Sequence, residues 1–143
     1  MYKNFKHNTP IQVRFGDIDS MNHVNNAKYL TYIESARIHY IQDVLNSDVD
    51  HSKYSVILAS ANIEFLKPVI LGDEIEVFTR CSRIGNRSLD LDYEIVKKNS
   101  DGMVSVAKAR TILVGFNYET QQSVAVLDAW KEKISTFEGE NYD

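Results

Sequence analysis

The sequence has few of the residue types and segments that mark secreted or membrane proteins. It contains one cysteine, Cys81, so no disulfide can form within the chain, which is typical of a reducing, cytoplasmic setting. No apolar run approaches the ~20 residues of a membrane-spanning helix, and the first residues do not resemble a secretory signal. We therefore expect a cytoplasmic protein with no membrane partner.

Basic residues are too few for a general nucleic-acid-binding protein. The chain has 16 Lys and Arg residues against 20 Asp and Glu residues, which gives a net charge of −4. Nucleic-acid binding depends on a basic face that neutralises phosphates. The composition argues against nucleic acid as a partner, but it is compatible with one phosphorylated small molecule held by a few local cations.

Several common catalytic patterns are also missing. There is no Gly-rich phosphate loop and no Gly-x-Ser-x-Gly elbow, so a Ser-His-Asp hydrolase is not expected. His7, His39 and His51 show no metal-ligand spacing with Cys81 or with one another, so no metal site is predicted. The length and the 43% hydrophobic content suit a single globular domain, which we expect to span residues 1–143.

The chemically useful residues that are present gather in one polar turn ahead of a helix. The turn holds two carboxylates, one imidazole and two amides: Asp17, Asp19, His23, Asn25 and Asn26. The free N–H groups and partial positive charge of a helix N-terminus stabilise an anion. A carboxylate beside such a terminus could attack a carbonyl while the terminus holds the oxyanion. The same residue types are also common caps, so a purely structural role is the alternative.

An amphipathic helix is predicted to follow, over about residues 26–45. Apolar residues recur on one face at helical spacing: Tyr29, Tyr32, Ile33, Ala36, Tyr40 and Val44. Such a stripe needs burial against another layer. The helix is therefore expected to be covered by the rest of the fold.

Strands are predicted along most of the remaining chain. Alternation and turn residues indicate strands near residues 11–15, 54–66, 74–84, 89–95 and 103–116, hairpin turns at Gly85-Asn86 and Asn99–Gly102, and a closing helix near 127–137. Successive hairpins favour an antiparallel sheet. The sequence thus predicts an α+β fold, in which one long helix covers one face of an antiparallel β-sheet and a short C-terminal helix closes the chain.

Two finer expectations concern the charged strand near residues 89–95 and the C-terminal tail. Centring the second hairpin sets Asp92 opposite Lys108. It also sets Asp90 opposite Arg110, and the acidic side chains of this strand suggest a solvated face. The tail from Glu138 onward is expected to fray.

One stretch resembles the signature of hotdog-fold thioesterases, in particular the 4-hydroxybenzoyl-CoA thioesterase-like group, which includes acyl-CoA thioesterases. It reads Asp19-Ser-Met-Asn-His23-Val-Asn25-Asn26, followed by Tyr29, Tyr32, Glu34 and Ala36-Arg37. The resemblance is specific over about residues 13–40 and loose over most of the chain. It implies the hotdog fold, in which a curved antiparallel β-sheet is wrapped around one long central helix. It also implies a homodimer or a tetramer of dimers with the site at the subunit boundary.

The resemblance also implies an activity, the hydrolysis of an acyl-CoA or acyl-carrier-protein thioester. Coenzyme A would be part of the substrate, and no separate cofactor is expected. The family's carboxylate matches Asp19, as nucleophile or as the base that activates water, and its oxyanion donor matches the backbone N–H of Asn26. An acyl-thioester-binding hotdog protein without turnover, acting as a sensor or carrier, is the alternative.

Other positions receive less specific roles from the resemblance. His23 could orient water or brace the loop, and Asn25 belongs to the same motif. Asn22 stands where many members carry Gly, although Asn tolerates a left-handed backbone. Asp17 is expected to cap the turn or pair with Arg14.

The substrate-binding positions are also implied by the family. Tyr29, Tyr32 and Ile33 could line the acyl chain, although core packing would select the same residues. Arg87-Ser88 resembles a segment that lines the pantetheine channel, where Arg87 could meet the phosphates of coenzyme A.

Overall fold

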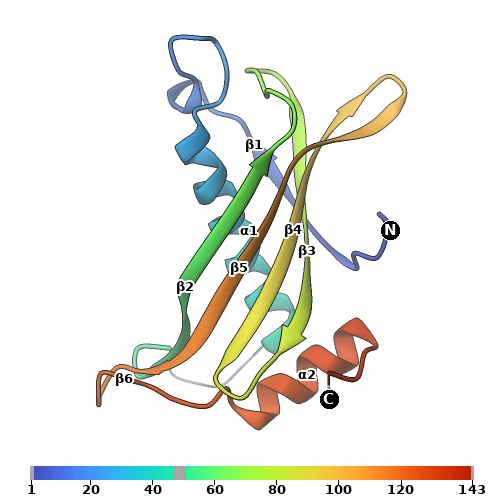
Figure 1. Cartoon of the computed structure of the whole chain (residues 1–143). Coiled ribbons are helices and arrows are strands. Elements are labelled where there is room, and N and C mark those ends of the chain that lie inside the picture. Colours follow the sequence, from blue (N-terminus) through green and yellow to red (C-terminus); the bar gives the residue numbers. More distant parts are fainter. Residues whose placement is uncertain (1, 47–50, 143) are drawn as a thin grey trace.

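The computed structural model describes residues 2–46 and 51–142, which form one antiparallel sheet and two α-helices (Figure 1). The elements are β1 (His7–Gln12), α1 (Asn26–Leu45), β2 (Tyr54–Phe65), β3 (Glu74–Ile84), β4 (Ser88–Asn99), β5 (Gly102–Asn117), β6 (Gln122–Ser123) and α2 (Asp128–Glu138). The strand order is β1-β3-β4-β5-β2, and β6 pairs with β5. Within the described residues, neither helix is long and apolar enough to cross a membrane.

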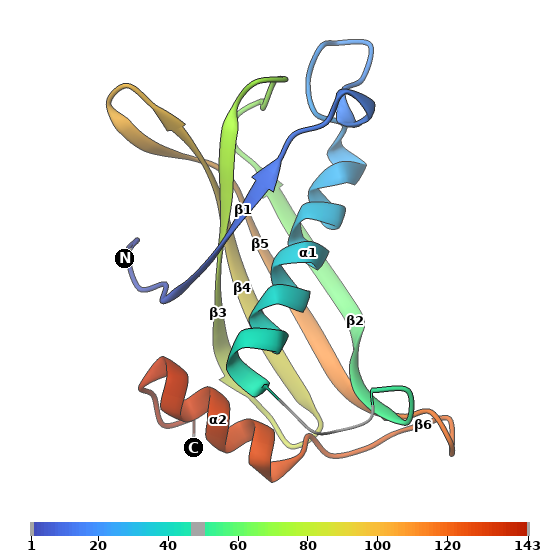
Figure 2. The same cartoon turned by 180° about the vertical axis from the view of Figure 1, so that it is seen from behind.

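The long helix lies in the concave face of the curved sheet, with β1 running beside it (Figure 2). Every residue of the predicted apolar stripe is buried, and Leu45 joins it at the last turn. The stripe packs with the inward side chains of β3, β4 and β5, including Val77, Leu91 and Leu113, in one core. The predicted α+β arrangement and the bounds of the helix are confirmed.

The predicted pairing of β4 with β5 is wrong by two residues. Asn99 pairs with Gly102, and a bulge after Ile95 shifts the pairing by one further residue. Asp92 therefore lies opposite Arg110, whose guanidinium donates to its two carboxylate oxygens at 2.6 and 3.0 Å. A bulge leaves one residue unpaired, and simple hairpin counting does not anticipate it.

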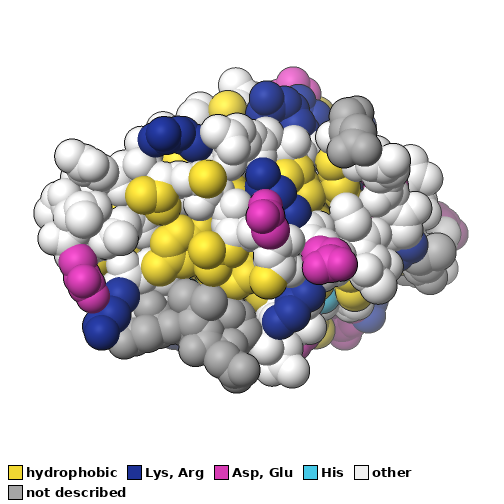
Figure 3. All heavy atoms as spheres, turned by 90° about the horizontal axis from the view of Figure 1, so that it is seen from below, with side chains coloured by type: hydrophobic (Ala, Val, Ile, Leu, Met, Phe, Trp, Pro, Cys, Tyr) yellow, Lys and Arg dark blue, Asp and Glu magenta, His cyan; other side chains and the backbone are white. Residues whose placement is uncertain are grey.

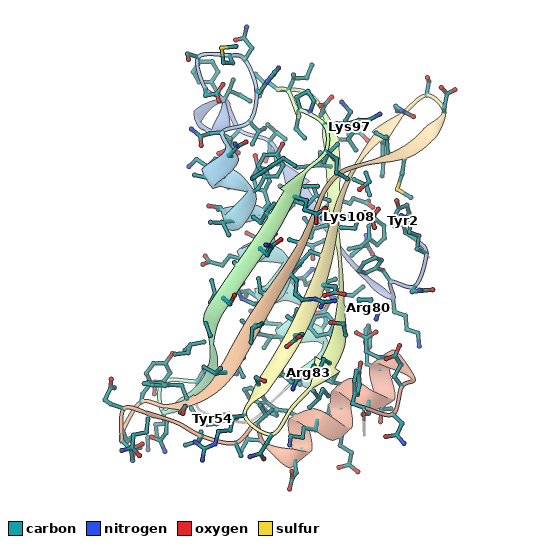
Figure 4. All side chains as sticks on the ribbon, in the orientation of Figure 1. Tyr2, Tyr54, Arg80, Arg83, Lys97 and Lys108 are labelled. Carbon is teal, nitrogen blue, oxygen red and sulfur yellow. The ribbon has the colours of Figure 1, made fainter. Side chains whose placement is uncertain are left out.

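The acidic face of β4 is covered rather than solvated. Glu94 is 5% exposed and accepts hydrogen bonds from the Tyr2 hydroxyl at 2.8 Å and from Lys3 Nζ at 3.0 Å. Figure 4 shows Tyr2 on the segment that runs beside the sheet. Burial would raise the pKa of Glu94, but these two donors and the charge of Lys3 hold it below its usual value. The N-terminal segment is thus fastened to the sheet.

The first strand begins earlier and ends earlier than its apolar pattern predicts. β1 pairs with β3 from His7 to Gln12, whereas the sequence indicated residues 11–15. Phe15 begins a 3₁₀ turn, Phe15–Asp17, and is 83% exposed. The Asp17 carboxylate accepts from the backbone N–H of Arg14 at 3.0 Å, which stabilises this turn in place of a longer strand.

The tail from Glu138 is also more ordered than expected. Glu138 is 7% exposed, and its Oε2 accepts hydrogen bonds from the Tyr40 hydroxyl at 2.7 Å and the backbone N–H of Cys81 at 2.9 Å. The Tyr142 hydroxyl donates to the carbonyl oxygen of Cys81 at 2.8 Å. Burial raises the pKa of the Cys81 thiol to about 12, so this cysteine is protonated and unreactive at neutral pH.

Candidate active site

The polar turn ahead of α1 is a small closed loop. Ile18 bridges Val24, and the backbone N–H of Asp19 donates to the carbonyl of His23 at 2.8 Å. The N–H of Val24 donates to the carbonyl of Val69 at 2.8 Å, which fixes the loop to the segment after β2. Asn22 has φ of 64°, the left-handed conformation that Asn tolerates in place of Gly. Asn22 in place of the Gly found in many family members is therefore compatible with the turn.

Asp19 holds this loop together through one of its carboxylate oxygens. The side chain is partly buried, and Oδ1 accepts from the backbone N–H of Met21 at 2.9 Å and of His23 at 3.4 Å. Oδ2 takes part in none of the hydrogen bonds recorded for the described residues. The carboxylate is thus anchored at Oδ1, while Oδ2 has no hydrogen-bond donor among residues 2–46 and 51–142.

The start of α1 combines a cap with an unpaired donor. Asn25 is the N-cap, and its side-chain oxygen accepts from the backbone N–H of Ala27 at 2.9 Å. Its own N–H donates to the carbonyl of Asp17 at 2.8 Å. In the described chain no hydrogen bond uses the backbone N–H of Asn26, the first helical residue. This N–H lies at the positive end of the helix dipole, where an oxyanion would be stabilised.

A cleft of about 240 Å³ opens at this helix terminus. It is lined by His23, Val24, Asn26, Tyr29, Phe65, Leu66, Lys67 and Pro68. Tyr29 packs edge-on against Phe65, with ring centroids 5.1 Å apart. The contribution of residues 65–68 was not predicted from the sequence; the available signal was the apolar pair Phe65 and Leu66 shortly before Pro68.

Tyr32 and Ile33, predicted with Tyr29 as acyl-chain liners, lie in the core and do not line this cleft. The Tyr32 hydroxyl donates to Asp17 Oδ2 at 2.7 Å in a buried contact. Burial would raise the pKa of Asp17, but the hydrogen bonds from Tyr32 and the Arg14 N–H, together with the charge of Lys28, lower it. Burial and the neighbouring carboxylate raise the pKa of Tyr32 itself. Asp17 therefore has the capping role expected of it.

Replacing Tyr32 with Phe should destabilise the fold by about 1.5–3 kcal/mol at neutral pH, because a buried carboxylate loses a donor. The folded-state pKa of Asp17 lies below its ordinary value of 3.8, so its stabilisation is present above that value and is lost as the pH falls through the folded-state pKa. The difference between wild type and Tyr32→Phe should thus shrink in acid. Urea unfolding at neutral pH and at about pH 3 measures this difference in the free energy of unfolding. A pH-independent difference would mean that Tyr32 does not stabilise the fold through the Asp17 carboxylate.

Arg87 and Ser88 are not near this cleft in the same chain. The carbonyl of Arg87 accepts from Gly115, which pairs with Val56 near the start of β2, whereas Phe65 at the cleft ends β2. The two ends of such a strand are on the order of 30 Å apart. Arg87 Nη1 donates to the carbonyl of Ser123 at 3.0 Å. Figure 3, a view of this end of the molecule, shows Lys and Arg interspersed with Asp and Glu rather than one basic patch.

A second cluster of functional side chains forms where β1 passes α1. Ligating atoms of His7, His39 and Asp43 lie within 4.8 Å of one another. Asp43, one helical turn beyond His39, was not predicted as a possible ligand, because the prediction rested on the spacing of His and Cys residues alone. Residues from a strand and a helix meet here through the fold alone.

Comparisons with known proteins agree with this architecture. The model of the thioesterase-like superfamily matches residues 13–134. A thioesterase from Thermus thermophilus, solved with coenzyme A and Zn, is 31% identical, with a TM-score of 0.82 over 97% of this chain and 98% of that one. The protein YsmA of Bacillus subtilis is 27% identical over 124 residues, 87% of this chain and 82% of the relative.

A more distant solved structure shares the fold alone. It is Slr0204, a 1,4-dihydroxy-2-naphthoyl-CoA thioesterase from Synechocystis, which is 21% identical with a TM-score of 0.76 over 90% of this chain and 94% of that one. Together, the antiparallel sheet around a central helix, the family match and these structures lead to one conclusion. The chain has the hotdog fold and belongs to the thioesterase-like superfamily.

Proposed function

We propose that this protein hydrolyses an acyl-CoA or acyl-carrier-protein thioester to the free acid and the thiol. The observation that carries the proposal is the cleft at the N-terminus of α1, where the Asn26 N–H has no partner among the described residues. An unpaired N–H at the positive end of a long helix is suited to an oxyanion. The Thermus thermophilus thioesterase solved with coenzyme A supports this class of substrate.

The proposed chemistry begins with the thioester carbonyl oxygen accepting from the Asn26 N–H. Asp19 then either attacks the carbonyl carbon itself or removes a proton from a water molecule that attacks it. The carbonyl electrons move to the oxygen, which the helix terminus stabilises. When the carbonyl re-forms, the C–S bond breaks and the thiolate leaves; in the nucleophilic route, water then hydrolyses the acyl-Asp19 anhydride. A thiolate is a good leaving group, so no strong acid is required.

His23 and the cleft-lining side chains would position the substrate. His23 lies at the cleft, across the loop from Asp19, and could orient the attacking water. Tyr29 and Phe65 form an apolar wall against which the first part of an acyl chain could pack. The hydrolytic step would need no cofactor other than the coenzyme A of the substrate.

A second copy of the chain would supply Arg87 and Ser88. Within the described sheet, β2 pairs only with β5, and its outer edge carries exposed Leu58, Ala59 and Ala61. An unpaired apolar edge favours pairing with another chain. If two copies joined their β2 edges antiparallel about a twofold axis, the Arg87 end of one copy would lie beside the cleft of the other. We therefore propose a homodimer, or a tetramer of dimers, with a shared site.

If Arg87 meets the phosphates of coenzyme A, Arg87→Ala should raise KM by about 10-fold, the effect of losing a charge-assisted contact of roughly 1.5 kcal/mol. The rise should be much smaller for an ester of a simple pantetheine analogue, which lacks the nucleotide phosphates. Steady-state kinetics with both esters measure it. Equal changes in KM for the two esters would show that Arg87 does not contact the phosphates of coenzyme A.

Mixing two variants tests whether the site is shared. In a heterodimer of Asp19→Asn with Arg87→Ala, one site carries both defects and the other carries none. Random reassembly should restore about a quarter of the wild-type sites, measured at low substrate concentration where Arg87→Ala is poor. Activity no higher than the average of the two unmixed variants would mean that Arg87 and Asp19 do not serve one site across two chains.

The second candidate function is binding of an acyl thioester without turnover. It is favoured by one observation, that Oδ1 of Asp19 is engaged by backbone N–H groups of its own loop. Release of free thiol from a panel of acyl-CoAs of different chain length separates the two functions. Tight binding of an acyl-CoA with thiol release at the background rate would establish the binding function and overturn the proposal of hydrolytic activity.

A further inference from the structure

The cluster of His7, His39 and Asp43 differs from an ordinary ion pair because two imidazoles contact the same carboxylate oxygen. His7 Nε2 lies 2.9 Å from Asp43 Oδ2, and His39 Nε2 lies 3.0 Å from the same oxygen. The two imidazole rings contact each other edge to face, with centroids 4.7 Å apart. Two imidazole nitrogens thus contact one carboxylate oxygen. Asp43 lies one turn after His39 on α1, and His7 belongs to β1.

The cluster has a buried side and an open side. The His7 side chain is 6% exposed, whereas those of His39 and Asp43 are 41% and 49% exposed. An ion held here would be anchored from within the fold, and water could complete its coordination from solvent. Three protein ligands and one water are the usual set of an open zinc site.

The hydrogen bond behind His39 orients its ring. Thr9 Oγ1 lies 2.8 Å from His39 Nδ1, on the opposite side of the ring from the cluster. When Nδ1–H donates to this hydroxyl, Nε2 carries the free electron pair that a metal needs. Metal-binding histidines characteristically have such a partner, which fixes the tautomer and the ring orientation. Thr9 is buried on β1, two residues after His7, so β1 provides one ligand and one supporting contact.

We propose that His7, His39 and Asp43 form a binding site for a divalent transition-metal ion of the zinc class. Zinc binds imidazole nitrogen and carboxylate oxygen at roughly 2.0–2.2 Å, which places tetrahedral ligands about 3.3 Å apart. The two nitrogen–oxygen separations of 2.9 and 3.0 Å would have to lengthen slightly, and the three ligand atoms already lie within 4.8 Å of one another. A site with two nitrogens and one carboxylate is better suited to zinc, cobalt or nickel than to magnesium or calcium, which prefer oxygen alone.

The ion would have a structural role and would take no part in thioester hydrolysis. His39 lies 13 residues along α1 from Asn26, which corresponds to about 20 Å of helix. At that distance the ion could not polarise a thioester bound at the helix N-terminus. It would instead join the edge strand β1 to the second half of α1, so the folded state would gain stability from metal binding.

The experiment uses the full chain treated with a chelator and then titrated with zinc by calorimetry. We expect one zinc ion per chain and a rise in Tm that grows with zinc concentration. Cobalt in place of zinc should give visible d–d absorption typical of a tetrahedral site. A wild-type protein that binds no zinc at one equivalent, with an unchanged Tm, would show only a hydrogen-bonded His–Asp–His cluster and overturn the proposal.

Variants locate the ion. His39→Ala and Asp43→Ala change partly exposed side chains, and each should weaken zinc binding by more than 100-fold (roughly), since each removes a direct ligand. Thr9→Val, which removes only the supporting hydrogen bond, should weaken it by about 10–100-fold. His51→Ala, at an exposed histidine outside the cluster, is the matched control and should bind like wild type.

Two outcomes among the variants would count against the site. Binding in Asp43→Ala as tight as in wild type would mean that the ion is held elsewhere. An equal loss in His51→Ala and His39→Ala would indicate nonspecific binding to surface histidines. Circular dichroism of each metal-free variant shows whether it is folded, and a folded Asp43→Ala is sufficient for the decision.

Discussion

Asp19→Asn is expected to lower kcat for acyl-CoA hydrolysis by about 10²–10⁴-fold, which is the usual contribution of a general base. Asn retains the side-chain oxygen that accepts from the N–H groups of Met21 and His23, so the loop should keep its shape. It lacks the negative charge that either attacks the carbonyl or takes the proton of water. KM should change little, because the cleft walls and Asn26 are untouched.

Asp101→Asn is a matched control for this substitution. Asp101 is an exposed carboxylate in the turn between β4 and β5, and its loss removes the same charge from the chain. Thiol-release assays of wild type and both variants, with urea unfolding to confirm equal stability, measure the effect. If Asp19→Asn turns over like Asp101→Asn, the carboxylate of residue 19 takes no part in the reaction.

Glu138→Ala is expected to lower the free energy of unfolding by about 2–5 kcal/mol. The substitution leaves two buried donors, the Tyr40 hydroxyl and the Cys81 N–H, without their acceptor, and each such donor costs about 1–3 kcal/mol. These bonds, at 2.7 and 2.9 Å, join the end of α2 to α1 and β3. Urea unfolding monitored by circular dichroism provides the measurement.

Two further variants separate hydrogen bonding from charge. Glu138→Gln keeps one acceptor oxygen and should lose less stability than Glu138→Ala. Glu140→Ala removes an exposed carboxylate two residues later and should stay within about 0.5 kcal/mol of wild type. Equal stability of Glu138→Ala and Glu140→Ala would mean that the buried network contributes nothing to folding.

Elements with strong local signals were predicted well. The helix over 26–45 was predicted correctly because its apolar stripe, its cap Asn25 and its buried face all follow from residues close in sequence. The fold class followed from the hairpin turns. The turn with Asn22 in a left-handed conformation also agreed with what the side chain allows.

Features that depend on distant segments were predicted poorly. The bulge that brings Arg110 opposite Asp92 leaves no signal in either strand alone. Glu138 was expected in a frayed tail because its partners, Tyr40 and the Cys81 N–H, are far away in the chain. The role of Asp19 in hydrolysis stays a prediction, whereas the tertiary structure adds the anchoring of its Oδ1 and its backbone hydrogen bond to His23, one of the residues that line the cleft.

The central helix, the antiparallel strands and the polar turn can all be read from the amino-acid sequence, because periodicity, capping and turn chemistry act over a few residues. The tertiary structure alone decided that residues 65–68 complete the cleft, that Arg87 lies at the far end of the chain's own sheet, and that His7 meets His39 and Asp43. These juxtapositions depend on how a strand and a helix far apart in sequence pack together, and no local pattern encodes that packing.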